Sequence, residues 1–176
     1  MFVKFRLWQE KRFSAFDPDG MEYNEVLGKN KNGGWPWTES ERVLVPVNLK
    51  NEHWVAVALN FHEQIIHVYN SGKSPTMRGQ LRPLAIMLPK LLDQLGFYDI
   101  KPPKKKLGPN GVWSVELEPT AKQDGAGDCG IYVIKFIQCL AFGEEDISSI
   151  KAEHTKKYRR ELSLLLFEYG TANNRT

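Results

Sequence analysis

The chain has 176 residues, a formal net charge of +3, 41% hydrophobic residues and 11% aromatic residues. This length and composition indicate one globular domain with its own hydrophobic core and exclude a disordered chain. No apolar run approaches the roughly 20 residues needed to cross a bilayer, so we expect no membrane-spanning segment. The mild positive charge permits an acidic partner without requiring one.

The first 40 residues carry few regular patterns. Apolar residues alternate with charged ones over residues 3–7, which predicts a short strand. The segment Trp35–Trp37 places two aromatic residues around a proline. We interpret it as a packed loop, with a binding platform as the open alternative. Residues 1–40 are therefore expected to be a divergent N-terminal segment of the same domain.

Three strands are predicted next, at residues 43–49, 53–59 and 64–69. The last two are separated by a short polar connection, which favours an antiparallel hairpin. His53 begins the first strand of this hairpin, and Asn70 follows the end of the second. The hairpin is therefore expected to bring His53 and Asn70 close together.

The remainder of the chain alternates between helical and extended patterns. Apolar residues spaced at 3.6-residue intervals predict a helix over residues 81–95, and alternation predicts a strand over 113–117. A last helix is predicted over residues 156–169, with Gly170 as its stop and a flexible tail at 171–176. The face of this helix that we expect to be buried consists of Tyr158, Leu162, Leu165, Leu166 and Tyr169.

The stretch most suggestive of chemistry precedes and includes Cys129. Gln123 is followed by a small, glycine-rich run, then by Cys129 and a mostly apolar segment. This pattern predicts a tight loop that delivers Cys129 to the first turn of a buried helix. The N–H groups of such a turn stabilise a thiolate, and with the Gln123 amide they are suited to hold an oxyanion. The alternative is that Cys129 is a small buried hydrophobic residue.

The two cysteines also bear on the setting of the protein. If the helix forms, Cys129 and Cys139 lie about 15 Å apart along its axis, at 1.5 Å per residue. A disulfide requires Cα atoms within about 7 Å of one another, so we expect free thiols. Free thiols indicate an intracellular protein, in the nucleus or the cytoplasm.

Four residues fit one reaction, the attack of a thiol on a carbonyl group. Cys129 is the candidate nucleophile and His53 the candidate base, since the other three histidines lie in a turn, inside a strand and before the last helix. Asn70 is suited to orient the imidazole ring, and Gln123 to donate a hydrogen bond to the oxyanion. This chemistry requires no metal and no cofactor.

The order of these motifs resembles the Ulp1-type cysteine proteases, which act on SUMO and related ubiquitin-like modifiers. The matching segments are VLVPVNLKNEHWVAVAL at 43–59, IIHVYNS at 65–71 and QDGAGDCGIYVIKF at 123–136. Their details are most similar to divergent Ulp1-like proteins of plants, many carried by transposons. The resemblance implies an α+β, papain-like fold of the Ulp1/adenain type, with a protease core at 41–170. In it, a mixed or antiparallel sheet is packed by a central helix that carries the nucleophile.

Residue by residue, the resemblance implies His53 as general base, Asn70 in the orienting position, Gln123 at the oxyanion hole and Cys129 as nucleophile. Trp54 matches the tryptophan that helps to roof a narrow tunnel for the Gly-Gly end of the modifier. Strand alternation, however, directs Trp54 to the opposite face from His53, unless the strand begins at this pair. The implied partner is a ubiquitin-like modifier with its conjugates, and the protein is expected to be a monomer.

Two features depart from the family pattern. Asn70 stands where the family usually has aspartate. A cysteine site tolerates this change, because both nitrogens of an imidazolium carry protons and an amide oxygen accepts one of them. In addition, the helical segment that precedes the core in most relatives, with its substrate-facing tryptophan, is not recognisable in residues 1–40.

Three other functions stay open. A relative that binds a modifier without cutting it is suggested by Asn70 and by the altered N-terminal segment. A Cys-dependent acyltransferase would use the same residues, but nothing in the sequence indicates a site for coenzyme A. The basic clusters at 104–106 and 156–160 are interpreted as solvated surface rather than as a nucleic-acid site.

Overall fold

A computed structural model describes residues 17, 20–29, 35–73, 78–104, 107, 111–143 and 147–173. The strand predicted at residues 3–7 lies outside the described residues. The described residues fall into two compact units. Unit 1 draws on Met1–Val45, Val57–Val68 and Ser74–Leu117, and unit 2 on Pro46–Ala56, Tyr69–Lys73 and Glu118–Thr176. The domain boundaries expected from the sequence stay a prediction.

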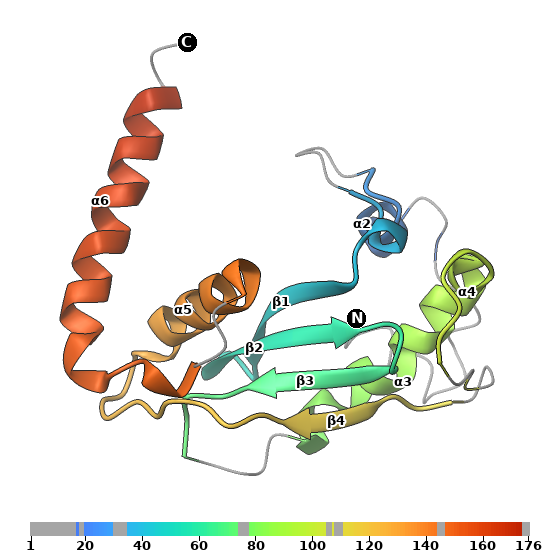
Figure 1. The fold of residues 1–176 in the computed structure, drawn as a ribbon, viewed down its shortest axis with the longest axis horizontal. Coiled ribbons are helices and arrows are strands. Elements are labelled where there is room, and N and C mark those ends of the chain that lie inside the picture. The colour runs from blue at the N-terminus through green and yellow to red at the C-terminus, as the bar shows by residue number, and fades with distance from the viewer. Residues whose placement is uncertain are drawn as a thin grey trace. The chain divides into compact units, whose positions relative to one another are not determined.

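Four strands form one sheet in the order β1-β2-β3-β4 (Figure 1). They are β1 (Arg42–Leu49), β2 (His53–Asn60), β3 (Ile65–Tyr69) and β4 (Ser114–Leu117). A turn at residues 61–64 joins β2 to β3, so the predicted hairpin is confirmed. β4 pairs in parallel with β3, from Ile65 opposite Ser114 to Val68 opposite Leu117. The sheet is therefore mixed, one of the two arrangements expected.

The helices of unit 1 are α2 (Met21–Val26), α3 (Arg78–Gln94) and α4 (Phe97–Ile100), with a short 3-10 turn at Trp37–Glu39. α3 begins at Arg78, earlier than the predicted Leu81, and ends before Gly96, whose φ of 64° suits a glycine. Of the apolar positions predicted to face the core over residues 81–95, Leu81, Ala85, Leu88, Leu91 and Leu92 are buried, and Leu84 and Leu95 are half-buried.

The core of unit 1 is centred on the buried ring of Phe61. Its centroid lies 5.0 Å from that of Phe97, 5.7 Å from that of Trp37 and 6.1 Å from that of Trp113. Trp35, in contrast, is 78% exposed. The packed-loop interpretation of Trp35–Trp37 thus holds for Trp37 and is wrong for Trp35, because only the second ring reaches Phe61.

Unit 2 contains the predicted cysteine helix, α5 (Cys129–Phe142), which ends at Gly143 with a φ of 76°. Cys129 is the first residue of α5, as predicted. One face of α5 is buried, and it carries Tyr132, Val133, Phe136, Cys139 and Leu140. Both cysteines are free, which confirms the expectation of unpaired thiols.

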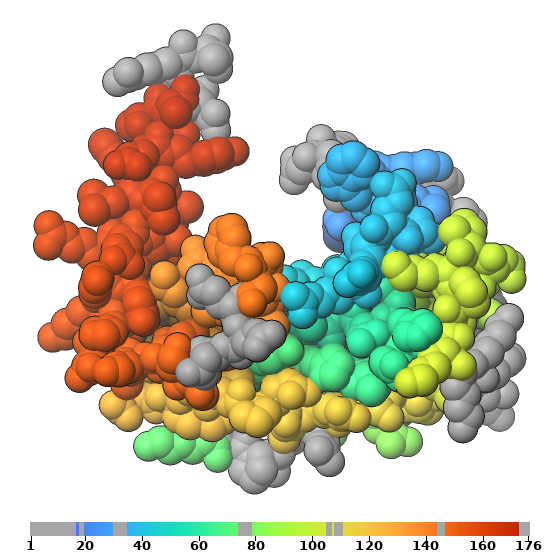
Figure 2. Space-filling view, in the orientation of Figure 1, coloured from blue at the N-terminus to red at the C-terminus, as the bar shows by residue number. Residues whose placement is uncertain are grey.

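Two 3-10 turns, Ile147–Ser149 and Ala152–His154, lead to the last helix, α6 (Thr155–Asn173). The predicted stop at Gly170 is wrong, since α6 continues to Asn173. The predicted buried face is also wrong in its second half, because Leu165, Leu166 and Tyr169 are 56%, 63% and 71% exposed. Within unit 2, the last turns of α6 extend beyond α5 (Figures 1 and 2), and Leu165, which lines an open groove between the two helices, stays exposed.

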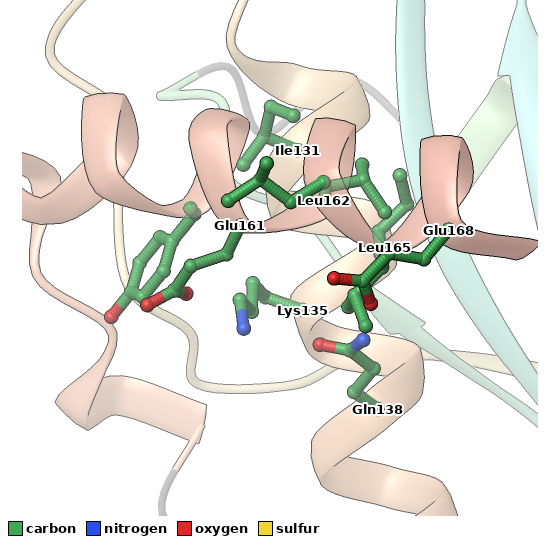
Figure 3. Close-up of a pocket in the computed structure, with 10 residues that line it drawn as sticks. Ile131, Lys135, Gln138, Glu161, Leu162, Leu165 and Glu168 are labelled. Carbon is green, nitrogen blue, oxygen red and sulfur yellow. The ribbon is translucent and has the colours of Figure 1, made fainter.

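The part of α6 that does contact α5 encloses a groove of about 360 Å³ (Figure 3). The α5 side contributes Ile131, Lys135 and Gln138, and the α6 side contributes Leu162 among others. The Lys135 ammonium lies 4.6 Å from the centroid of the Tyr158 ring. None of the predicted site residues lines this groove, because it follows a different face of α5. None of the described helices, α6 included, combines the length and the apolar character needed to cross a membrane.

Candidate active site

His53 and Asn70 meet at the end of the β2–β3 hairpin, as the sequence predicts. The His53 Nε2 and Asn70 Oδ1 atoms are 2.8 Å apart. The first residue of β2 and the residue after β3 lie together because the strands are neighbours with a short turn at their far ends. Asn70 is buried and His53 is half-buried, so this hydrogen bond is partly shielded from water.

The backbone determines which way the Asn70 amide faces. The Gly72 N–H donates to the same Asn70 Oδ1 atom at 2.7 Å, so this atom is the oxygen and not the nitrogen. His53 Nε2 must then be the donor of the bond to Asn70. In the neutral ring, Nδ1 is left as the basic nitrogen. Asn70 therefore selects the tautomer whose Nδ1 is able to take a proton from a thiol.

Gly72 is a further residue of this site, and it is not among the residues predicted from the sequence. A Cβ atom at Gly72 would lie 3.1 Å from His53 Nε2, His53 Cε1 and Asn70 Oδ1. Such contacts are tighter than nine in ten real Cβ contacts, so a side chain here would require the ring or the amide to shift by a few tenths of an ångström. The signal was present in the sequence as a glycine two residues after Asn70.

The main chain of Asn70 is held by two further side chains. Its carbonyl oxygen accepts hydrogen bonds from Thr120 Oγ1 at 2.6 Å and from Lys122 Nζ at 2.8 Å. Partial burial lowers the pKa of Lys122 from its ordinary value. The Tyr132 hydroxyl of α5 donates to the Lys122 carbonyl oxygen at 3.2 Å. The segment that orients His53 is thus tied through Lys122 to the cysteine helix.

Gln123 is connected to the residue after Asn70. The Gln123 N–H donates to the Ser71 carbonyl at 2.9 Å, and the Ser71 hydroxyl donates to Gln123 Oε1 at 2.8 Å. Gln123 Nε2 donates one hydrogen to the Gly125 carbonyl at 2.9 Å. An amide nitrogen carries two hydrogens, so one further donor is left for another acceptor. These bonds hold the side chain in a defined orientation, which a preorganised oxyanion donor requires.

Cys129 lies at the start of α5 and is buried, with 8% of its surface exposed. The helix is initiated by Asp128, whose carbonyl accepts from the Ile131 and Tyr132 N–H groups at 3.0 and 3.2 Å. The positive end of the α5 dipole therefore lies at Cys129, the first residue of the helix. The pairing of this sulfur with the His53 ring stays a prediction.

Trp54 is the predicted residue that the structure does not join to the others. It is 39% exposed and is the second residue of β2, which begins at His53. An exposed tryptophan beside the site is available to a partner. Its contact with a substrate remains a prediction.

The geometry of the site is therefore a hydrogen-bonded path within unit 2 from His53 through Asn70 and Ser71 to Gln123. Cys129 follows Gln123 six residues later at the first turn of a helix. Comparison with protein families gives a match over residues 8–173 to the Ulp1 protease family, C-terminal catalytic domain. The chain belongs to the Ulp1 protease family. Among curated proteins, none matches it by sequence.

Three solved structures are compared with the chain, and the first of them resembles it in fold. A structure of the SUMO protease Ulp1, with its catalytic cysteine oxidised to a sulfenic acid, has a TM-score of 0.52 at 15% identity, over 96% of this chain and 74% of that one. The yeast Ulp1 protease domain in complex with Smt3, the yeast ortholog of SUMO, has a TM-score of 0.49 at 17% identity over 68% of this chain and 49% of that one. XopD of Xanthomonas campestris bound to ubiquitin has a TM-score of 0.46 at 17% identity, over 90% of this chain and 74% of that one.

The predicted α+β fold of the Ulp1 type is thus confirmed by the family match and by the mixed sheet. The chain spans about half the length of the first Ulp1 chains compared, at 49% and 56% of their residues. The family match covers the C-terminal catalytic domain of this family.

Proposed function

We propose that this chain is a thiol protease or isopeptidase that cleaves after the C-terminal Gly-Gly of a ubiquitin-like modifier such as SUMO. Cys129 is the nucleophile, His53 the general base, Asn70 the residue that orients the ring, and Gln123 an oxyanion donor. Trp54 is the candidate substrate contact.

The observation that carries this proposal is the hydrogen bond from His53 Nε2 to Asn70 Oδ1. This hydrogen bond leaves Nδ1 as the basic nitrogen of the His53 ring. The ring lies in unit 2, whose helix α5 begins with Cys129, a cysteine outside any disulfide. The family match supplies the class of reaction. Membership of the family and the SUMO protease activity named for Ulp1 support a modifier as the substrate class.

The proposed reaction has two halves. In the first, His53 Nδ1 takes the proton of Cys129, and the thiolate forms a bond to the carbonyl carbon of the last glycine. The oxygen of that carbonyl becomes an oxyanion, which the first-turn N–H groups of α5 and the Gln123 amide are suited to hold. The C–N bond then breaks as His53 returns the proton to the leaving amine. In the second half, water hydrolyses the thioester with His53 again as base.

The test is a panel of modifiers that end in Gly-Gly and carry a C-terminal aminomethylcoumarin group. We expect the protein to release the dye from at least one modifier of the panel, because a glycine without Cβ passes a slot that other residues block. A folded protein that releases dye from none of them would remove this specificity.

A binding module that holds a modifier without cutting it is the second candidate, and Asn70 in place of aspartate is the feature that suggests it. Modifier vinyl sulfones separate the two functions, because they react only with an activated thiol. An enzyme forms a covalent adduct at Cys129, whereas a binding module retains the probe without forming the adduct.

The amide at position 70 gives a further expected result. Changing Asn70→Asp keeps both hydrogen bonds, from His53 and from the Gly72 N–H, and adds a charge that stabilises the imidazolium. We expect kcat/KM on the modifier substrate to be unchanged or raised, by up to about tenfold. Asn70→Ala, which loses both bonds, serves as the comparison and should be slower than the wild type. Complete loss of activity in Asn70→Asp would contradict the assigned role.

A further inference from the structure

Arg159, which the sequence analysis assigned to a solvated basic cluster, has a defined partner in the loop before the cysteine. Its Nη2 atom donates to Asp128 Oδ1 at 2.7 Å and to the Gly127 carbonyl at 3.0 Å. The Arg159 side chain is 49% exposed and that of Asp128 only 23%. The contact joins the first turns of α6 to the two residues that directly precede Cys129.

The position of Asp128 makes this contact informative. Asp128 is the N-cap residue of α5, with a helical φ of −90° and ψ of −9°. An aspartate in the extended conformation usual at an N-cap accepts a hydrogen bond from the first turn of its helix. In the described first turn of α5, the Asp128 carboxylate makes no such bond. One oxygen is bound by Arg159, and the other lies over Gly125, where an added Cβ would come within 3.3 Å.

A carboxylate that capped α5 would compete with catalysis in two ways. It would accept hydrogen bonds from N–H groups that a thiolate or an oxyanion uses. Its negative charge would also repel the negative charge of the thiolate or of the oxyanion. Pairing with Arg159 both turns the carboxylate away and balances its charge. An ion pair that is this exposed contributes little to the stability of a fold. We therefore expect the Arg159–Asp128 pair to act mainly on the N-terminus of α5.

We propose that Arg159 is a positioning residue that keeps the Asp128 carboxylate off the N-terminus of α5, so that the terminus serves the Cys129 thiolate and the oxyanion. The inference rests on the proposed role of Cys129 as nucleophile. It assigns to α6 a part in the activity, although Arg159 itself does not touch the reacting atoms.

The test measures the rate at which iodoacetamide alkylates Cys129, in a Cys139→Ser background that removes the other thiol. This rate needs no modifier, so it is informative even if the proposed substrate class is wrong. We expect Arg159→Met to slow alkylation about tenfold. Methionine retains the helix propensity and much of the stem. The matched control is Arg160→Met, the exposed neighbour on α6, which should change the rate less than twofold.

A double variant separates the mechanism from a general loss of structure. In an Asp128→Ala background the competing carboxylate is absent, so the addition of Arg159→Met should change the rate less than twofold. Equal slowing in both backgrounds, or a wild-type rate in Arg159→Met, would overturn the proposal. If circular dichroism shows that Arg159→Met does not fold, Arg159→Lys decides instead. Lysine retains one ion pair without the second hydrogen bond, so it should give an intermediate rate, and a wild-type rate would overturn the proposal.

Discussion

Changing Cys129→Ser is expected to lower kcat/KM on a Gly-Gly modifier substrate by about 10⁴-fold or more, close to complete loss. A hydroxyl in this site is a far poorer nucleophile than a thiol, because the helix terminus that stabilises a thiolate does not ionise a serine. The fold should be unaffected, since the two side chains differ by one atom. The measurement is the rate of dye release from one modifier substrate. Thermal unfolding of the variant checks that it is folded.

The same helix provides a matched control. Cys139 is also free and is also 8% exposed, but it lies in the last turns of α5 and has no place in the candidate site. Cys139→Ser should retain activity within about twofold of the wild type, with only the modest cost in stability of a polar atom in the core. Loss of activity in Cys139→Ser together with retention in Cys129→Ser would reverse the assignment of the nucleophile.

Changing His53→Gln is expected to lower kcat/KM by about 10³- to 10⁴-fold. Glutamine retains a donor for Asn70 Oδ1 at a similar position, so the segment after β3 should stay in place. It has no nitrogen that takes a proton from Cys129, and the thiolate loses its counter-charge. The alkylation rate of Cys129 at neutral pH should fall as well, which shows the effect on the nucleophile without any modifier.

His62→Gln is the control for this variant. His62 is exposed in the turn that joins β2 to β3, at the opposite end of the hairpin from Asn70. Its replacement should leave both the turnover and the alkylation rate within about twofold of the wild type. If His53→Gln matched His62→Gln in both measurements, His53 would not be the base.

Much of the fold was predictable from local patterns in the chain. The hairpin follows from two apolar runs joined by a short connection, and β4 from alternation. The helix α3 follows from apolar residues at helical spacing, its end from Gly96, and α5 from an apolar run after a glycine-rich loop. These patterns are short in range and largely independent of the rest of the chain. The meeting of His53 with Asn70 was also predictable, because a short turn leaves little choice of register.

The supports of the site were not predictable in this way. Thr120 and Lys122 bind the Asn70 carbonyl from about 50 residues away in the chain, and Arg159 binds Asp128 across 31 residues. The sequence around a charged helix residue does not indicate its partner, so Arg159 was interpreted as a solvated residue. Only the packing of α6 beside α5 brings the guanidinium to the loop before Cys129.

The burial of residues on the last helix could not be predicted from the sequence alone. Its apolar residues correctly indicated a helix, but they did not say which of them would be covered, and Leu166 and Tyr169 are exposed. Helix formation depends on neighbours a few residues apart, which the sequence contains. Burial depends on what lies opposite, which is decided by the whole chain. The chemistry proposed for Cys129, His53 and Asn70 thus follows from the types and order of these residues, whereas the contacts that hold His53 and Asn70 in place arise only on folding.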